Sequence, residues 1–164
     1  MAAHNTSASS MKRIKIIAVG RLKTPHWKDA AAHYMKRLSH SLRLEEIIVR
    51  DAALALPVTE RKIREGASIL KQTRPGNTLI CLDEGGKQMN SRAFAEFLSC
   101  LATSGKIPCF AIGGAYGLAS DVLNAATHTL AFGPMTFPHE LARIILLEQL
   151  YRAERILAGS GYHH

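Results

Sequence analysis

The chain has 164 residues, of which 47% are hydrophobic, and a formal net charge of +8. This length predicts one domain, and the apolar share is enough to form a core. Because no apolar stretch approaches membrane-spanning length and the N-terminus lacks a signal-peptide core, we expect a cytoplasmic protein rather than a membrane or secreted one. The positive charge favours an acidic partner such as nucleic acid, although some soluble proteins are basic without one.

The three cysteines, Cys81, Cys100 and Cys109, have no C-x-x-C spacing, and an odd number cannot all pair within one chain. Cys81 and Cys109 lie in apolar runs typical of buried strands. We therefore expect free thiols in a reducing compartment and no disulfide framework. No His, Cys, Asp or Glu cluster has metal-ligand spacing, so no metal is expected.

The first half of the chain alternates apolar runs with helical segments. Residues 1–11 are small and polar, and we expect a disordered extension. In chain order, the pattern then predicts a strand at 14–19, a helix at 25–39, a strand at 44–49, a loop at 52–57 and a helix at 59–71. The first helix has a typical start, because Thr24 supplies a capping hydroxyl and Pro25 fits the first helical position.

The second half repeats this alternation. In chain order, the pattern predicts a turn at 74–77, a strand at 78–82, a chain break at 85–86, a helix from residue 90 or 91 to 104, a strand at 107–112, a short helix at 120–126, a strand at 127–131 and a last helix at 138–157. The strands are apolar on both faces. We therefore expect an α/β fold with a mostly parallel sheet, helices on both faces and a single domain over 12–164.

A glycine-rich turn, GGAYG at 113–117, follows the fourth predicted strand. Glycines let the backbone approach a ligand closely and leave N–H groups open to its polar atoms. The turn lacks the G-x-G-x-x-G spacing of a dinucleotide-binding loop, and no acidic residue follows where one would bind a ribose. Taken alone, the turn supports a ligand-binding loop and a bare turn equally.

A second segment, LDEGGK at 82–87, follows the third predicted strand. Ligands of α/β proteins bind at the carboxyl ends of parallel strands. Asp83 and Glu84 are suited to binding ribose hydroxyls or to acting as a base. For these two side chains, a solvated acidic turn is the slightly favoured alternative.

A third segment, FGPMTFPHE at 132–140, joins the fifth predicted strand to the last helix. Its Gly-Pro pair predicts a sharp turn, and Pro138 fits the first helical position, where backbone amides point outward. Phe132, Met135 and Phe137 offer either apolar contact to a flat ring or core packing.

The last helix carries Arg143, Arg152 and Arg155, which we expect to point away from its apolar stripe. Guanidinium groups suit phosphate recognition, although a solvated helix face is the simpler interpretation, and the one favoured for Arg155.

Together these segments resemble the bacterial RlmH family of SPOUT-class RNA methyltransferases. The resemblance begins near residue 12 and covers nearly all the rest of the chain. It depends on the order and spacing of GRLKTPHWKDAAAHYMKRL, LDEGGKQMNSRAFAEFL, IGGAYG, MTFPHELAR, EQLYRA and YHH.

The resemblance implies a SPOUT-type parallel α/β sheet with a deep trefoil knot near the C-terminus, a homodimer, and S-adenosylmethionine as cofactor. The implied reaction is methylation of N3 of a pseudouridine in 23S rRNA, at the subunit interface of the assembled 70S ribosome. Carried over residue by residue, the expected cofactor contacts are Leu82, Gly113, Phe132, Gly133, Pro134, Met135, Thr136 and Phe137.

The implied reaction also gives roles to the last helix and the tail. His139 and His163 are the candidate bases for the N3 proton, with no choice between them, and loss of the proton to water is a third possibility. Arg152 is expected to be catalytic and Arg143 to bind substrate, through phosphates or the N3 anion. The remaining expected substrate contacts are Tyr162, stacked on the target base, and His164.

Two departures from the family pattern keep other functions open. The family commonly has serines before its MTFPH segment, whereas residues 131–134 here contain none, and His164 stands where the family usually has Arg or Lys. The alternatives are a SPOUT-fold methyltransferase acting on a different RNA and an RNA-binding module without transfer activity. The GGAYG and MTFPH segments favour cofactor binding over the latter.

Overall fold

The computed structural model describes residues 12–161. The predicted N-terminal extension and the predicted site residues Tyr162, His163 and His164 therefore lie outside the described residues. The strands are β1 (Lys12–Val19), β2 (Leu42–Val49), β3 (Asn77–Gln88), β4 (Ile107–Ile112) and β5 (His128–Ala131). The helices are α1 (Pro25–Leu38), α2 (Val58–Gln72), α3 (Ser91–Thr103), α4 (Ser120–Ala125) and α5 (His139–Leu157).

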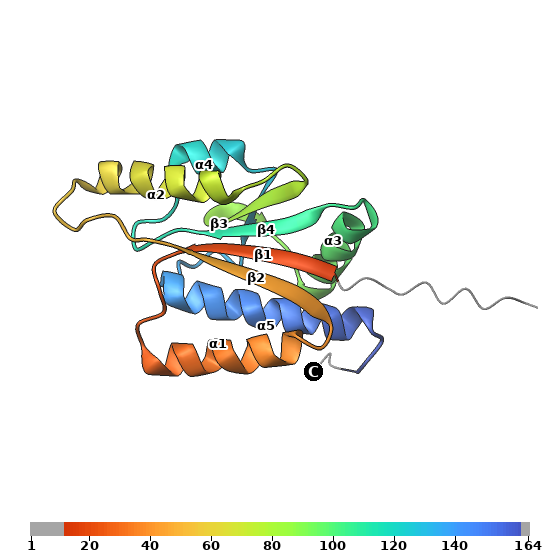
Figure 1. Ribbon diagram of the computed structural model, residues 1–164. Helices are drawn as coiled ribbons and strands as arrows, with labels where there is room; N and C mark the ends of the chain where they lie inside the picture. The colour runs from red at the N-terminus through yellow and green to blue at the C-terminus, as the bar shows by residue number, and fades with distance from the viewer. Residues whose placement is uncertain (1–11, 162–164) are drawn as a thin grey trace, which may run out of the picture.

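The five strands form one sheet in the order β2-β1-β4-β3-β5. Every pairing between these strands is parallel. Helices α1, α3 and α5 cover one face, and α2 and α4 cover the other (Figure 1). The predicted α/β fold with helices on both faces is confirmed. None of the helices within 12–161 is long and apolar enough to cross a bilayer.

Alternate residues of the central strands fill two separate cores. In β1, Ile14 and Ile16 pack in the core beneath α1, α3 and α5, whereas Ile17 packs in the core beneath α2 and α4. In β4, Phe110 packs in the core beneath α1, α3 and α5, and Cys109 packs in the core beneath α2 and α4. Successive strand side chains point to opposite faces, so a strand covered on both sides is largely apolar. This is why the apolar runs were visible in the sequence.

The predicted chain break at Gly85 and Gly86 is wrong, because β3 continues through both residues. The strand changes register between Leu82 and Lys87, both of which are paired with Leu130 of β5. A Cβ on Gly86 would lie 2.6 Å from the Leu130 carbonyl carbon. Glycine at this irregularity permits close approach of two strands and does not end the strand.

The starts of α5 and α1 differ in detail from the prediction, and the start of α3 matches one of two predicted caps. Pro138 is the N-cap of α5, not its first residue. For α3, the two candidate caps are resolved in favour of Asn90, whose side chain accepts the Ala93 N–H at 2.8 Å. The Thr24 hydroxyl makes no cap bond. It donates instead to Glu140 of α5 at 2.8 Å.

Glu140 holds the start of α1 against α5. Besides the Thr24 hydroxyl, its carboxylate accepts the Lys23 backbone N–H at 2.5 Å. This backbone bond is the main reason why the pKa of Glu140 lies below its ordinary value. The carboxylate thus satisfies a donor near the N-terminus of α1 that the helix cannot satisfy itself.

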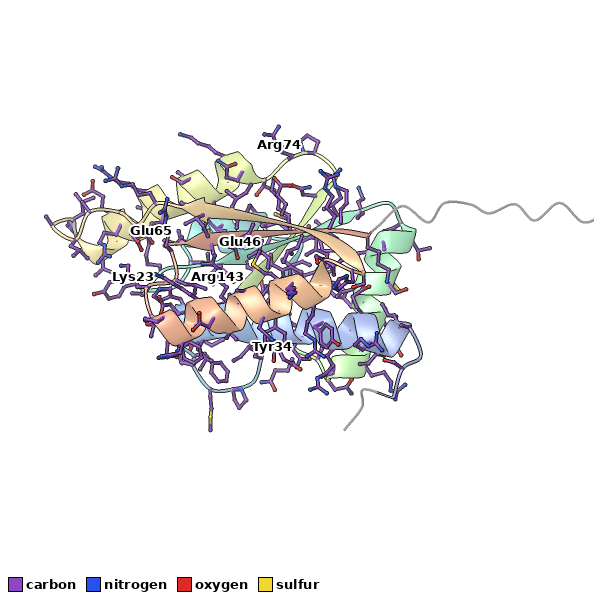
Figure 2. All side chains as sticks on the ribbon, turned by 60° about the horizontal axis from the view of Figure 1, so that its bottom comes forward. Lys23, Tyr34, Glu46, Glu65, Arg74 and Arg143 are labelled. Atoms are coloured by element: carbon purple, nitrogen blue, oxygen red, sulfur yellow. The ribbon has the colours of Figure 1, made fainter. Side chains whose placement is uncertain are left out.

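Arg143 lies in a buried ion pair and not on a solvated face of α5. Arg143 is only 4% exposed, and its Nη2 lies 2.6 Å from Oε1 of Glu46 on β2. Its Nε donates to Glu46 Oε2 at 3.0 Å and its Nη1 to the Gly20 carbonyl at 3.3 Å (Figure 2). A buried guanidinium needs such partners, so this arginine fastens α5 to the edge of the sheet. The helical spacing alone did not reveal that β2 supplies a carboxylate here.

Burial decides the state of the cysteines. Cys81 and Cys109 are buried and free, as predicted, and Cys100 is exposed and free. Burial raises the pKa of the Cys81 thiol to about 12 and that of the Cys109 thiol to about 11. Both groups therefore remain protonated near neutral pH and act as small apolar core side chains.

Replacing Glu46 with alanine leaves the Arg143 cation buried without its counter-ion. We expect Glu46→Ala to lower the free energy of unfolding by about 3 kcal/mol, measured by urea titration. Glu60→Ala is the matched control, because it removes the exposed Glu60–Arg64 pair and is expected to cost less than about 1 kcal/mol. Equal losses for the two variants would contradict the anchoring role of Arg143.

Candidate functional site

A cavity of about 840 Å³ opens at the carboxyl ends of β4 and β5, beside the irregular part of β3. In a parallel sheet these ends lie at one edge, where α/β proteins bind ligands. Its walls come from residues 82–84 within β3, the loop after β4, the loop between β5 and α5, and parts of α2 and α4. The residues that line it are Lys62, Leu82–Glu84, Ile112–Leu118, Leu123, Leu130–Gly133, Met135–His139 and Ala142.

The loop after β4 forms one wall through close backbone packing. A Cβ on Gly113 would lie 2.6 Å from the Gly117 carbonyl carbon. Gly117 has φ of 77°, a left-handed conformation that favours glycine. Gly114 and Gly117 also form an isolated antiparallel bridge. The glycines therefore let this loop fold tightly on itself, and the folded loop lines the cavity.

Helix α2 supports this loop from outside. The guanidinium carbon of Arg61 lies 5.2 Å from the centre of the Tyr116 ring, and Tyr116 is exposed at the cavity. The buried carboxylate of Glu65 accepts the Ala52 N–H at 3.0 Å and lies beside Gly114.

The loop between β5 and α5 forms the opposite wall. Phe132 and Phe137 are half-buried, whereas Met135 is largely exposed. Phe132 packs against the core beneath α1, α3 and α5. The Thr136 hydroxyl donates to the Glu84 carboxylate, so this loop is joined to β3 at this point.

Most of the predicted cofactor residues meet in this cavity. They are Leu82, Gly113, Phe132, Gly133, Met135, Thr136 and Phe137, and the predicted catalytic residue His139 lines the same space. Pro134 belongs to the same loop but is not among the lining residues. Lys62 was missed by the sequence reasoning, because nothing local to α2 indicates that the sheet topology brings it to the strand ends.

Two predicted site residues lie elsewhere on α5. Arg143 is held in the ion pair with Glu46. Arg152 does not line the cavity, and its Nη2 pairs with Glu148 one turn earlier at 2.8 Å. Arg152 lies thirteen positions after His139 on α5, a distance of about 20 Å along the axis.

The cavity combines an apolar interior with a polar mouth. Ile112, Leu118 and Leu130 are almost fully buried, and Glu84 and Thr136 are exposed. This arrangement suits a ligand with a flat apolar ring at one end and hydroxyl and charged groups at the other. Within residues 12–161, no three His, Cys, Asp or Glu side chains are grouped as metal ligands would be.

A family model described as "Predicted SPOUT methyltransferase" matches residues 11–163. A protein of Nitratidesulfovibrio vulgaris strain DP4, named "Ribosomal RNA large subunit methyltransferase H", is 52% identical over 155 residues, covering 94% of this chain and 99% of that protein. Proteins with the same name from Oleidesulfovibrio alaskensis and Lawsonia intracellularis are 51% and 49% identical over 94% of this chain, and 100% and 99% of their own lengths are covered.

The fold also has a counterpart among solved structures. A methylase family protein from Neisseria gonorrhoeae superposes with a TM-score of 0.51 at 16% identity, covering 85% of this chain and 82% of that one. At this identity the likeness concerns the fold alone. The family match and the close relatives identify the chain as a methyltransferase whose methyl donor is S-adenosylmethionine. The chain belongs to the SPOUT methyltransferase family and, within it, to the RlmH family of ribosomal RNA large subunit methyltransferase H proteins.

Proposed function

We propose that this chain transfers a methyl group from S-adenosylmethionine to N3 of a pseudouridine in 23S rRNA, within the assembled 70S ribosome in the cytoplasm. The observation that carries the proposal is the gathering of the three strand-end loops, to which the resemblance assigns the cofactor, around one cavity. The names of relatives sharing about half of their residues with this chain support a ribosomal RNA substrate, and the net charge of +8 suits RNA.

The residues of the cavity fit this cofactor. Gly113 has no Cβ, so the Gly117 backbone packs directly against it and holds the loop after β4 in the shape that lines the cavity. The apolar residues of the cavity offer contact to the adenine ring; they are Leu82, Ile112, Leu118, Leu130, Phe132 and Phe137. Pro134 shapes the loop between β5 and α5. The cofactor supplies an electrophilic methyl group on a sulfonium, and the main task of the protein is to hold N3 in line with it.

His139 is the base candidate within the described residues, because it lines the cavity at the start of α5. It would accept the N3 proton as the methyl group is transferred, and a positioned base contributes on the order of 100-fold to the rate. His163 is the second candidate, and Tyr162 and His164 belong with it in the tail that we propose to border the target nucleotide. Arg143, by contrast, is engaged with Glu46, so we assign it to anchoring α5.

Arg152 gives a physical reason for the proposed homodimer. A side chain about 20 Å along the helix from His139 cannot act on the same base within one subunit. A second copy of the chain can bring its Arg152 to the cavity of the first. We also propose that residues 12–164 work as one domain and that the loops around the cavity belong to the trefoil knot implied by the resemblance.

The proposal is tested by transfer of labelled methyl from S-adenosylmethionine to ribosomes lacking the modification. Free 23S rRNA and separated subunits serve as parallel substrates. We expect label on intact ribosomes alone, at N3 of a pseudouridine at the subunit interface. Label on another RNA would support a different substrate, in line with the altered His164 tail. No label on any RNA would support a binding module without transfer activity.

Gly113→Ala tests the cofactor cradle. The added Cβ would meet the Gly117 carbonyl carbon at 2.6 Å, so the loop has to open. We expect affinity for S-adenosylhomocysteine to fall about tenfold or more, measured by calorimetry. Gly161→Ala is the control, because nothing lies within 4 Å of its Cβ position. Unchanged affinity in a Gly113→Ala protein with a normal thermal unfolding curve would contradict the cradle.

Arg152→Ala tests the transfer machinery separately from the cofactor. We expect the transfer rate to fall about 100-fold, because a charge that stabilises the developing anion is lost. Affinity for S-adenosylhomocysteine should stay the same, since Arg152 does not line the cavity. Arg155→Ala, an exposed arginine on the same helix, is expected to transfer normally. A normal rate for Arg152→Ala would show that this role is wrong.

A further inference from the structure

Two polar side chains meet at the mouth of the cavity. Oγ1 of Thr136, in the loop before α5, donates a hydrogen bond to Oε2 of Glu84 on β3. Both side chains are exposed, and both line the cavity. The cavity therefore holds a carboxylate that already accepts a hydroxyl group from the opposite wall.

Glu84 differs from its neighbour Asp83 in what it binds. Asp83 Oδ1 accepts the Gly85 N–H of its own turn at 2.9 Å. Glu84 accepts only the Thr136 hydroxyl among the hydrogen bonds found within residues 12–161, and neither acid belongs to an ion pair in that range. An ionised carboxylate has about four acceptor positions. Glu84 therefore retains acceptor capacity toward the cavity.

The apolar interior sets the direction in which a nucleoside can enter. Ile112, Leu118 and Leu130 form the buried part of the cavity, which suits an adenine ring. An adenine seated there directs its sugar toward the polar mouth. The hydroxyl groups of the sugar would then face the side occupied by Glu84 and Thr136.

We propose that Glu84 accepts hydrogen bonds from the ribose hydroxyls of S-adenosylmethionine, and that the Thr136 hydroxyl takes the place of one of them in the free protein. The proposal concerns the same cavity and depends on the cofactor binding there. A carboxylate can accept hydrogen bonds from the two adjacent hydroxyls of a ribose, a pairing that other α/β proteins use for nucleotides. Glu84 thereby makes the site specific for a ribonucleoside.

A simpler role for Glu84 would be to anchor the loop before α5 through Thr136. The two roles differ in what they require of the ligand. Loss of an anchor weakens every ligand of the cavity equally, whereas loss of a ribose acceptor weakens only ligands that carry the hydroxyls. Thr136→Val removes the anchor bond and leaves the carboxylate in place.

The experiment is a calorimetric binding cycle on the full chain. The ligands are S-adenosylhomocysteine and its 2′-deoxy and 3′-deoxy analogues, and the proteins are wild type, Glu84→Ala, Thr136→Val and the exposed α3 control Glu96→Ala. We expect wild type, Thr136→Val and Glu96→Ala to bind S-adenosylhomocysteine about tenfold more tightly than at least one deoxy analogue. In Glu84→Ala this preference should fall to about twofold or less.

The outcomes separate this proposal from the proposed function. A preference that persists in Glu84→Ala, or an equal loss for all three ligands, would overturn the role of Glu84 and leave the cofactor site standing. Equal affinity of wild type for all three ligands would do the same. Absence of S-adenosylhomocysteine binding to wild type would overturn the cofactor site itself, and the role of Glu84 with it.

Discussion

Close approach of backbone to backbone, in the loop after β4 and at the irregular part of β3, is the constraint on which the cavity depends. Gly113 packs against Gly117 where a Cβ would lie 2.6 Å from a carbonyl carbon, and Gly86 packs against Leu130 at the same distance. Side chains at these two positions would push the walls apart. The absence of side chains at these two positions lets the neighbouring backbone segments pack closely and keeps the walls of the cavity in place.

Helix α5 connects the cavity to the edge strand β2. Its first turn lines the cavity through His139, and one turn later Arg143 is held by Glu46 on the edge strand β2. Glu140 adds the start of α1 to the same assembly. Because these buried or half-buried polar contacts have defined geometry, they fix the position of His139 relative to the loops. Glu46, which does not line the cavity, can in this way influence the shape of the cavity through Arg143.

The sequence predicted the features that have a local cause. A strand covered on both faces is largely apolar, so β1 and β4 were visible as apolar runs, and the alternation of such runs with helices indicated a parallel sheet. The three strand-end segments were recognisable by their glycines, prolines and family spacing. What could not be predicted depends on partners distant in sequence. The burial of Arg143 requires Glu46, the continuation of β3 through Gly86 requires Leu130, and the position of Lys62 requires the strand order.

The central claim is that the loops at the ends of β3, β4 and β5 hold the methyl donor. A crystal structure with S-adenosylhomocysteine tests it most directly. We expect the ligand to bind in the strand-end cavity, with its adenine in contact with Gly113 and with the loop between β5 and α5. A ligand bound elsewhere on the molecule, with this cavity left to solvent, would contradict the account.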